Sequence, residues 1–292
     1  MSASSHIWLN GRLVLAAEAR VSAFDHGLLY GHGVFETMRV YRGRVFRLRS
    51  HLDRLADGAR ILEISLPPHD TLERAVASVL EANRLSDARI RLTVTAGEGP
   101  ARPIVPAPGP PTILITWSPL ATLDTTAWER GYRLCLASTR RHSASPLARI
   151  KATNYLENLL AHAEAVRQSA DDAILLNERD DVTECCLSNL FIVRDKRVVT
   201  PSLDCGLLPG ITRAAVLEVA AECRVNASEE RVTMKQLVAA DEVFVTNSIV
   251  EVEPVTAIDG KRIGDGTPGP VTRQMANEYQ RLVARELGLS DG

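Results

Sequence analysis

The sequence predicts an α+β protein built from two domains. At 292 residues the chain reaches the size, about 250 to 300 residues, at which single hydrophobic cores stop growing efficiently. Both halves contain segments with the alternating pattern of strands and segments with the period of amphipathic helices. We expect a small N-terminal domain over 1–120, a linker over 121–126 and a larger C-terminal domain over 127–292.

Composition disfavours several classes of partner. Hydrophobic residues make up 45% and charged residues 24% of the chain, and the net charge of -2 gives no electrostatic reason to expect nucleic acid or an anionic membrane. The five cysteines lack CxxC spacing, which disfavours a disulfide framework and a zinc site and fits a reducing compartment. Without a signal-like N-terminus or an apolar run of about 18 residues, we expect a cytoplasmic protein with a small-molecule partner.

The first half opens with a sheet. Asn10-Gly11 between two short apolar runs is the strongest short signal for a hairpin. The glycine-rich stretch 24–33 follows, and its tight backbone beside aromatic and ionisable residues suits the wall of a pocket. The other expected elements are strands at Val34–Val40, Val45–Leu48, Ala88–Thr95 and Thr112–Trp117, helices around 49–59 and at Thr71–Asn83, and a long loop at Gly97–Pro111.

The second half is organised around a helix near mid-chain. Apolar residues recur at the spacing of one helix face between Leu156 and Val166, so a helix begins within a few residues of Lys151. The other expected elements are strands at Arg133–Ser138, Ala173–Asn177, Arg197–Thr200, Glu242–Ser248 and Val250–Pro254, and helices after Gly210 and at Val271–Leu287.

Lys151 is the first candidate for chemistry, although most lysines at helix starts are solvated surface charges. If the helical turn already includes Lys151, Tyr155 lies four residues further on and shares its face. The phenol could then contact whatever the amine holds. Glu184 is one carboxylate in an otherwise weakly polar segment and needs a partner.

Two further features could bind anions. Gly210 and Thr212 open a helix, where unpaired backbone N–H groups and a hydroxyl are favoured by the helix dipole; the alternative is an ordinary helix cap. Arg89 and Arg91 face the same way on a strand and either line an anion-binding cavity or lie on an exposed sheet face. A basic cluster that includes Arg54 begins the first long helix, with a solvated face as its alternative. His26 and His32 lack a cysteine or carboxylate at ligand spacing, so no metal site is expected.

Together these residues supply an amine, a phenol, a carboxylate, an anion site and an arginine. Pyridoxal 5'-phosphate needs such a set: a lysine for the Schiff base, an acid opposite the pyridine nitrogen and donors for the phosphate. Over nearly its whole length the sequence also resembles the class IV aminotransferase family, the fold-type IV pyridoxal-phosphate enzymes. The resemblance rests on Leu29–Gly31 with Gly33–Glu36, His51–Leu55, Lys151 with Asn154–Leu156, Thr183–Glu184 with Ser188–Phe191, Leu208–Arg213 and Thr246–Ser248.

The resemblance implies a role for each candidate. Lys151 resembles the Schiff-base lysine and proton shuttle, Glu184 the partner of the pyridine nitrogen, and Tyr155 the donor to the cofactor's phenolic oxygen. Contacts to the phosphate or the ring are implied for Arg54, Ile211, Thr212, Ser248 and Leu208. The resemblance further implies a small α/β domain, a larger domain with a barrel-like mixed or antiparallel sheet and flanking helices, and a homodimer. Its sites would lie between the domains, partly closed by a loop of the other subunit.

Within the family, the residues favour an aminodeoxychorismate lyase, which converts 4-amino-4-deoxychorismate to 4-aminobenzoate and pyruvate. Glu36-Thr37 and Asn247-Ser248-Ile249 stand where branched-chain aminotransferases usually carry Glu-Gly and Gly-Thr-Ala. A substrate with two carboxylates also requires more positive charge than an apolar pocket provides. The residues expected to bind substrate are Tyr30, Phe35, Arg89, Arg91, Arg102 and Asn247.

The alternative is a transaminase that moves an amino group between a branched-chain amino acid, a D-amino acid or an R-amine and a 2-keto acid such as 2-oxoglutarate or pyruvate. The segments Leu208–Arg213 and Gly269–Arg273 occur equally in transaminases. A scaffold without catalysis is the third interpretation, which the presence of both Lys151 and Glu184 disfavours. Two cysteines, Cys185 and Cys186, follow Glu184 and have no role in this scheme.

Overall fold

The structure, a computed structural model, describes residues 5–120 and 125–289. Unit 1 comprises the described part of Met1–Ala121 together with the short segment Ile150–Tyr155. Unit 2 comprises the described parts of Thr122–Arg149 and Leu156–Gly292. Most of the expected linker 121–126 lies outside the described residues, and the predicted domain limits stay a prediction.

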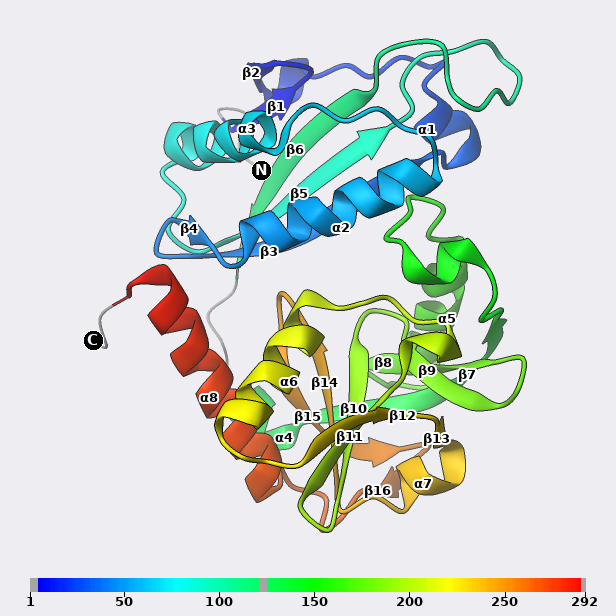
Figure 1. The fold of residues 1–292 in the computed structure, drawn as a ribbon, viewed down its shortest axis with the longest axis vertical. Helices are drawn as coiled ribbons and strands as arrows, with labels where there is room; N and C mark the ends of the chain where they lie inside the picture. Colours follow the sequence, from blue (N-terminus) through cyan, green and yellow to red (C-terminus); the bar gives the residue numbers. More distant parts are fainter. Residues whose placement is uncertain (1–4, 121–124, 290–292) are drawn as a thin grey trace. The chain divides into compact units, whose positions relative to one another are not determined.

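Unit 1 contains an antiparallel sheet with two helices on one face (Figure 1). Its strands are β1 His6–Leu9, β2 Arg12–Leu15, β3 Gly33–Tyr41, β4 Arg44–Val45, β5 Ala88–Thr95 and β6 Thr112–Pro119. Its helices are the 3-10 turn η1 Ala16–Glu18 and the α-helices α1 His26–Tyr30, α2 Leu48–Ile61 and α3 His69–Asn83. The strand order is β2-β1-β6-β5-β3-β4, and the expected hairpin is formed by β1 and β2.

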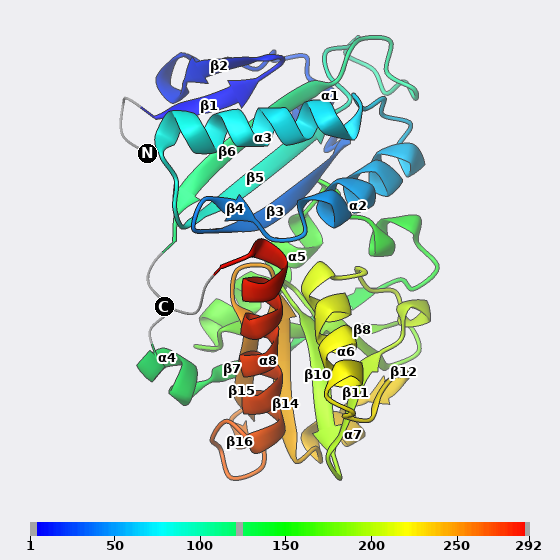
Figure 2. The same ribbon diagram turned by 60° about the vertical axis from the view of Figure 1, so that its left-hand side comes forward.

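The alternating side chains of β3 and β5 give this sheet two different faces. Met38, Ile90 and Leu92 belong to the buried core that the sheet forms with α2 and α3, which cover one side of the strands (Figure 2). Phe35 pairs with Thr93, which is two residues along β5 from Arg91, so Phe35 and Arg91 both lie on the opposite face. The sheet therefore separates an apolar core from a face that carries cations.

Unit 2 contains a ten-stranded mixed sheet of order β12-β11-β10-β14-β15-β7-β8-β9-β13, with β16 paired to β15. Its strands are β7 Tyr132–Arg141, β8 Asp172–Asn177, β9 Asp181–Cys185, β10 Asn189–Arg194, β11 Arg197–Pro201, β12 Ala227–Glu230, β13 Val232–Thr233, β14 Glu242–Asn247, β15 Glu251–Ile258 and β16 Lys261–Arg262. Its helices are α4 Thr125–Arg130, α5 Leu156–Arg167, α6 Ile211–Glu222, α7 Met234–Val238 and α8 Pro270–Leu287, with 3-10 turns η2 Pro146–Arg149 and η3 Leu203–Cys205.

Helices α6 and α8 pack side by side and against β14, while α5 packs on β7 and β8 (Figure 2). Apolar residues from β8, β10, β14 and β15 form the core of this unit. The predicted α+β class is confirmed, because each unit combines a sheet with helices that bury an apolar face against it. Among the described residues, no helix combines the length and apolar character required to span a bilayer.

Helix α5 begins at Leu156, within a few residues of Lys151 as predicted, and Lys151 therefore precedes its first turn. The leucines that define its apolar pattern are exposed: Leu156 at 71%, Leu160 at 62% and Leu159 at 52%. The buried side is formed by Ala161 and Ala165, whose small side chains let the helix approach β7 and β8 closely.

Candidate functional site

The backbone around Lys151 is fixed by pairing with the start of β3. The Lys151 carbonyl accepts a hydrogen bond from Phe35 N at 2.8 Å, and Thr153 N donates to the Gly33 carbonyl at 2.8 Å. The Thr153 hydroxyl donates to the Gly31 carbonyl at 2.8 Å. A Cβ on Gly33 would lie 2.7 Å from the Val94 carbonyl oxygen, so only glycine permits this close approach. Lys151 is therefore positioned by a sheet edge.

The Lys151 side chain lies among aromatic rings. Its Nζ is 4.8 Å from the centre of the Phe35 ring and 5.9 Å from that of Tyr155. The two rings meet edge to face at 5.5 Å. Lys151 and Tyr155 thus lie near the same ring, and a non-helical segment with a bend brings them there, not a helical turn.

A second cation contacts the same ring. The Arg91 Cζ lies 3.7 Å from the centre of Phe35, and its Nε donates to the Thr93 hydroxyl at 3.2 Å. Burial, together with the neighbouring charge of Arg89, lowers the pKa of Arg91. A guanidinium held in this way stays cationic at neutral pH and is suited to pair with an anion.

Arg54 is held by a carboxylate that the sequence did not single out for this role. Glu36, which is fully buried on β3, accepts hydrogen bonds from Arg54 at 2.8 and 2.7 Å and from His51 Nδ1 at 2.7 Å. Burial raises the pKa of Glu36, but Arg54 and His51 outweigh it and bring that pKa to about 2. The basic cluster is therefore partly internal, and Arg54 is oriented by an ionised partner.

In unit 2, Glu184 has the partner that its burial requires. Its Oε1 accepts a hydrogen bond from Arg141, and its Oε2 accepts from Asn189 Nδ2 at 3.0 Å and from Leu208 N at 3.3 Å. Arg141 and Asn189 are not among the site residues predicted from the sequence. Arg141 ends β7 next to Arg140, and only the strand register shows which of the two arginines turns inward.

The start of α6 offers backbone donors near these residues. Gly210 is the N-cap residue and provides no side-chain hydrogen bond to the first turn, where Ile211 and Thr212 begin the helix. A Cβ on Gly210 would lie 1.9 Å from the Asn189 Oδ1, so glycine is required for the helix start to pack against the partner of Glu184. Helix starts of this kind bind phosphate through their free N–H groups.

The side chains at the end of β14 differ in their hydrogen bonding. The Asn247 Oδ1 accepts hydrogen bonds from Ile249 N at 2.8 Å and Val250 N at 2.9 Å, which closes a turn around Ser248. The Thr246 hydroxyl is buried and has no hydrogen-bond partner among the described residues. A buried hydroxyl without a partner is costly and fits a ligand that would satisfy it.

The remaining predicted residues lie in loops or at helix ends of unit 1. Tyr30 ends α1 and is 40% exposed, and its ring meets that of His26 edge to face. Arg102 is exposed in the Gly97–Pro111 loop, which forms no helix or strand, as predicted. Unit 1 thus brings Lys151 together with Phe35, Tyr155 and Arg91, whereas Arg102 lies in a separate loop.

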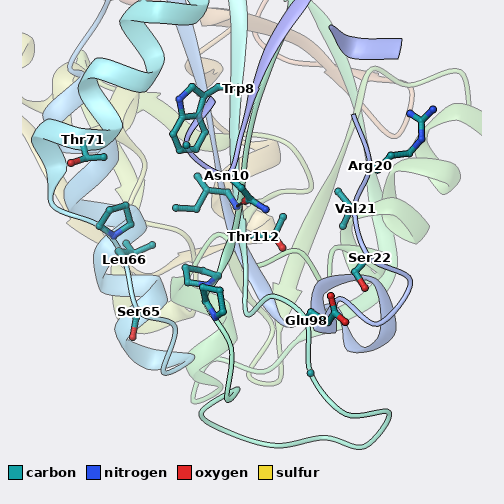
Figure 3. Close-up of a pocket in the computed structure, with 16 residues that line it drawn as sticks. Trp8, Asn10, Arg20, Val21, Ser22, Ser65, Leu66, Thr71, Glu98 and Thr112 are labelled. Atoms are coloured by element: carbon teal, nitrogen blue, oxygen red, sulfur yellow. Dashed lines mark hydrogen bonds between the residues drawn. The ribbon is translucent and has the colours of Figure 1, made fainter. Parts of the chain in front are cut away.

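A cavity of about 1190 Å³ occupies another part of unit 1 (Figure 3). Residues of β1, the 20–22 segment, the start of α3 and the ends of the Gly97–Pro111 loop line it, among them Trp8, Arg20, Thr71, Glu98 and Thr112. The predicted site residues do not belong to its described lining. This cavity is therefore distinct from the surroundings of Lys151.

The donor set fits a phosphorylated pyridine aldehyde. Lys151 supplies an amine, Glu184 an oriented carboxylate, and α6 an uncapped helix start, while Thr246 has an unsatisfied hydroxyl. Groups of these kinds bind the aldehyde, the ring nitrogen and the phosphate of pyridoxal 5'-phosphate in proteins. Lys151 belongs to unit 1, and the other three belong to unit 2.

Comparisons with known proteins identify the family of the chain. The chain matches the family model described as Amino-transferase class IV over residues 33–258. A Methanocaldococcus jannaschii protein, whose name assigns it provisionally to the branched-chain-amino-acid aminotransferases, is 38% identical over 94% of this chain and 96% of its own length.

Two solved structures have the same fold. The branched-chain amino acid aminotransferase of Escherichia coli superposes with a TM-score of 0.92 at 32% identity, covering 99% of this chain and 96% of that chain. The T.th. branched-chain amino acid aminotransferase with pyridoxamine 5'-phosphate has a TM-score of 0.90 at 33% identity, covering 98% and 95%. The protein is an enzyme of the class IV aminotransferase family, and its cofactor is pyridoxal 5'-phosphate.

Proposed function

We propose that the protein is a branched-chain amino-acid aminotransferase, which exchanges an amino group between a branched-chain amino acid and a 2-keto acid such as 2-oxoglutarate. The relatives described above carry that name and favour the transaminase alternative over the aminodeoxychorismate lyase suggested by the motifs. The observation that carries the proposal is the Phe35 ring, which contacts both the Lys151 amine and the Arg91 guanidinium. An apolar ring suits an aliphatic side chain, and the guanidinium suits a carboxylate.

Each residue would have one task in this reaction. When bound, pyridoxal 5'-phosphate supplies an aldehyde for an amine and an electron sink for the substrate's α-carbon. Lys151 would hold the aldehyde and would move the proton at the substrate's α-carbon. Tyr155 donates to the phenolic oxygen. Glu184, kept in place by Arg141, holds a proton on the ring nitrogen.

The proposal also assigns residues that would contact the phosphate and the ring of the cofactor. Backbone donors of the α6 start and the oriented Arg54 guanidinium are suited to a dianion, because charged hydrogen bonds of this kind are roughly twice as strong as neutral ones. The proposed contacts to the phosphate and the ring are Arg54, Ile211, Thr212, Ser248 and Leu208.

Substrate recognition is proposed for Arg91 and Phe35 first, with the exposed Arg89 as a second cation. Tyr30 and Arg102 complete the predicted set. The amide of Asn247 is already bonded to the backbone, so its proposed contribution is the shape of the turn that it closes.

We also propose that the enzyme is a homodimer. The outward face of α5 exposes Leu156, Leu159 and Leu160, which are three and four residues apart and therefore share one side of the helix. A second copy of the chain would cover it. Sedimentation of the wild-type protein and of Leu160→Glu tests this point: dimers that dissociate in the variant support it, and a monomeric wild type refutes it.

The activity is tested with purified enzyme in two parallel assays. One measures 2-oxoglutarate-dependent deamination of L-leucine, D-alanine and R-1-phenylethylamine, and the other measures 4-aminobenzoate and pyruvate from aminodeoxychorismate. Turnover of L-leucine alone supports the proposal, whereas product formation only in the second assay would overturn it. Borohydride reduction followed by peptide mapping should label Lys151, and Lys151→Ala should lose both the label and all activity.

A further inference from the structure

Three side chains that have no task in the proposed reaction converge beneath α5 in unit 2. His162 lies on α5, Asp172 is the first residue of β8, and Cys186 follows β9. One ligand atom of each lies within 4.8 Å of the corresponding atoms of the other two. Imidazole nitrogen, carboxylate oxygen and thiol sulfur are therefore gathered from three separate elements.

Asp172 is a buried carboxylate without a cation. It is 1% exposed, and its oxygens accept hydrogen bonds from Cys186 Sγ and Ser188 Oγ, both at 2.7 Å, and from the backbone N of Ala173 and Leu187. No arginine or lysine among the described residues forms an ion pair with it. Hydrogen bonds alone thus leave the charge poorly compensated.

His162 adds an imidazole nitrogen that nothing satisfies. Its Nδ1 is shielded from solvent and has no hydrogen-bond partner in the described part of the chain. A buried nitrogen of this kind loses the hydrogen bond that water would provide, which is a cost that a folded protein normally avoids. A cation bound by the imidazole would compensate the charge of Asp172, and one bound at Nδ1 would also remove that cost.

We propose that His162, Asp172 and Cys186 form a binding site for a divalent cation of the zinc type. Nitrogen, sulfur and carboxylate oxygen are the donors that Zn²⁺ takes, whereas Mg²⁺ and Ca²⁺ require oxygen alone. Bond lengths of about 2.0 to 2.3 Å in a tetrahedron place ligand atoms about 3 to 4 Å apart, so small side-chain rotations suffice. Binding forms a metal–sulfur bond at Cys186 and releases its thiol proton to solvent.

The site connects to the carboxylate proposed to hold the ring nitrogen. Asn158 Nδ2 donates to the Cys186 carbonyl at 2.6 Å, and its Oδ1 accepts from Arg141 Nη2 at 3.3 Å. Arg141 in turn pairs with Glu184. A cation that fixes Cys186 therefore also fixes the residues that orient Glu184. Metal binding at these three residues is independent of which substrate the enzyme uses.

Cobalt titration tests the site. Holoenzyme without an affinity tag is dialysed against a chelator and titrated with Co²⁺, whose tetrahedral bands lie at longer wavelengths than the cofactor absorbs. We expect about one Co²⁺ per chain, with a thiolate-to-metal band, and displacement of both signals by Zn²⁺. A wild-type enzyme without visible bands at saturating Co²⁺ would overturn the proposal.

Variants assign the ligands. Cys186→Ser should lose the thiolate band, and His162→Gln should weaken Co²⁺ binding by about 10-fold or more. Cys223→Ser, a change at a cysteine outside the cluster, should bind Co²⁺ as the wild type does. Retained cofactor and an unchanged circular dichroism spectrum show that each variant is folded. Unchanged bands and affinity in both ligand variants would place the metal elsewhere and refute the site.

Discussion

The Glu36 carboxylate, which is fully buried on β3, accepts two hydrogen bonds from the Arg54 guanidinium, at 2.8 and 2.7 Å. A bidentate pair of this kind fixes the plane of the guanidinium as well as its position. Removing one member leaves the other charge buried without compensation, which costs more than the pair itself contributes.

Glu36→Gln should make the protein less stable at neutral pH and flatten its acid response. The folded-state pKa of Glu36 is about 2, below the usual 4.5. Its stabilising contribution is therefore complete above about pH 4.5 and is lost as the pH falls towards 2. From the size of this shift we expect a contribution of about 3 kcal/mol. Urea unfolding across that range measures it, with the exposed Glu81→Gln as control. A constant difference between wild type and Glu36→Gln from pH 5 to 2.5 would contradict the assignment.

Glu253→Gln should have the opposite pH dependence. Burial, with a smaller contribution from Asp171, raises the pKa of Glu253 to about 7, and Arg130 opposes this only in part. Ionising the folded protein is therefore unfavourable, and stability is lost as the pH rises from about 4.5 to 7. With a discount for screening by solvent, the variant should be about 2 kcal/mol more stable than the wild type at pH 8 and equal to it near pH 4.5. Thermal unfolding of the wild type and of Glu253→Gln at both pH values measures this difference, with Glu18→Gln as control.

Substitutions of Arg91 and Arg89 should differ in how much they lower kcat/KM for 2-oxoglutarate and for L-leucine. Arg91 lies against Phe35, beside Lys151, whereas Arg89 is exposed on the same strand. We expect Arg91→Gln to lower kcat/KM for 2-oxoglutarate by about 10- to 100-fold, the cost of one charge-assisted pair, and for L-leucine by less. Arg89→Gln serves as the matched variant and should change both constants only a few fold. Equal losses in the two variants would show that neither arginine selects the dicarboxylate.

Glu184→Gln should lower kcat by roughly 100-fold or more, because a neutral amide cannot keep a proton on the ring nitrogen. Asn189→Ala, which removes one hydrogen bond to the same carboxylate, should cost much less. Single-turnover absorbance changes measure the chemical step apart from product release. Full activity in Glu184→Gln would remove Glu184 from the mechanism.

The sequence predicted element positions well where side chains alternate against a core. Strand β5 has the predicted limits, Ala88–Thr95, because its buried apolar residues and its polar residues occupy opposite faces. Helix α5 was more difficult. Its apolar stripe predicted the helix correctly but is exposed, because alanines on the other side allow the close approach to the sheet. Periodicity identifies a helix without identifying which face is covered.

Partners of the candidate residues were harder to predict than the residues themselves. Lys151 and Glu184 stand in recognisable segments, but Glu36 and Arg141 become partners only through strand register and tertiary packing. Cys186 shows the same limit. Its carboxylate and imidazole neighbours come from β8 and α5, so no local spacing predicts the cluster.

The short segment Ile150–Tyr155 belongs to unit 1, although the chain on both sides of it belongs to unit 2. A gene crossover anywhere between residues 122 and 149 would therefore join the β3 strand of one parent to the Lys151 segment of another. The two backbone hydrogen bonds of this pairing, and the glycine at position 33 that permits them, would then have to match between parents. Recombination between two parents would therefore preserve this pairing in one of two ways. Both segments of unit 1 come from the same parent, or the two parents have compatible residues at the pairing.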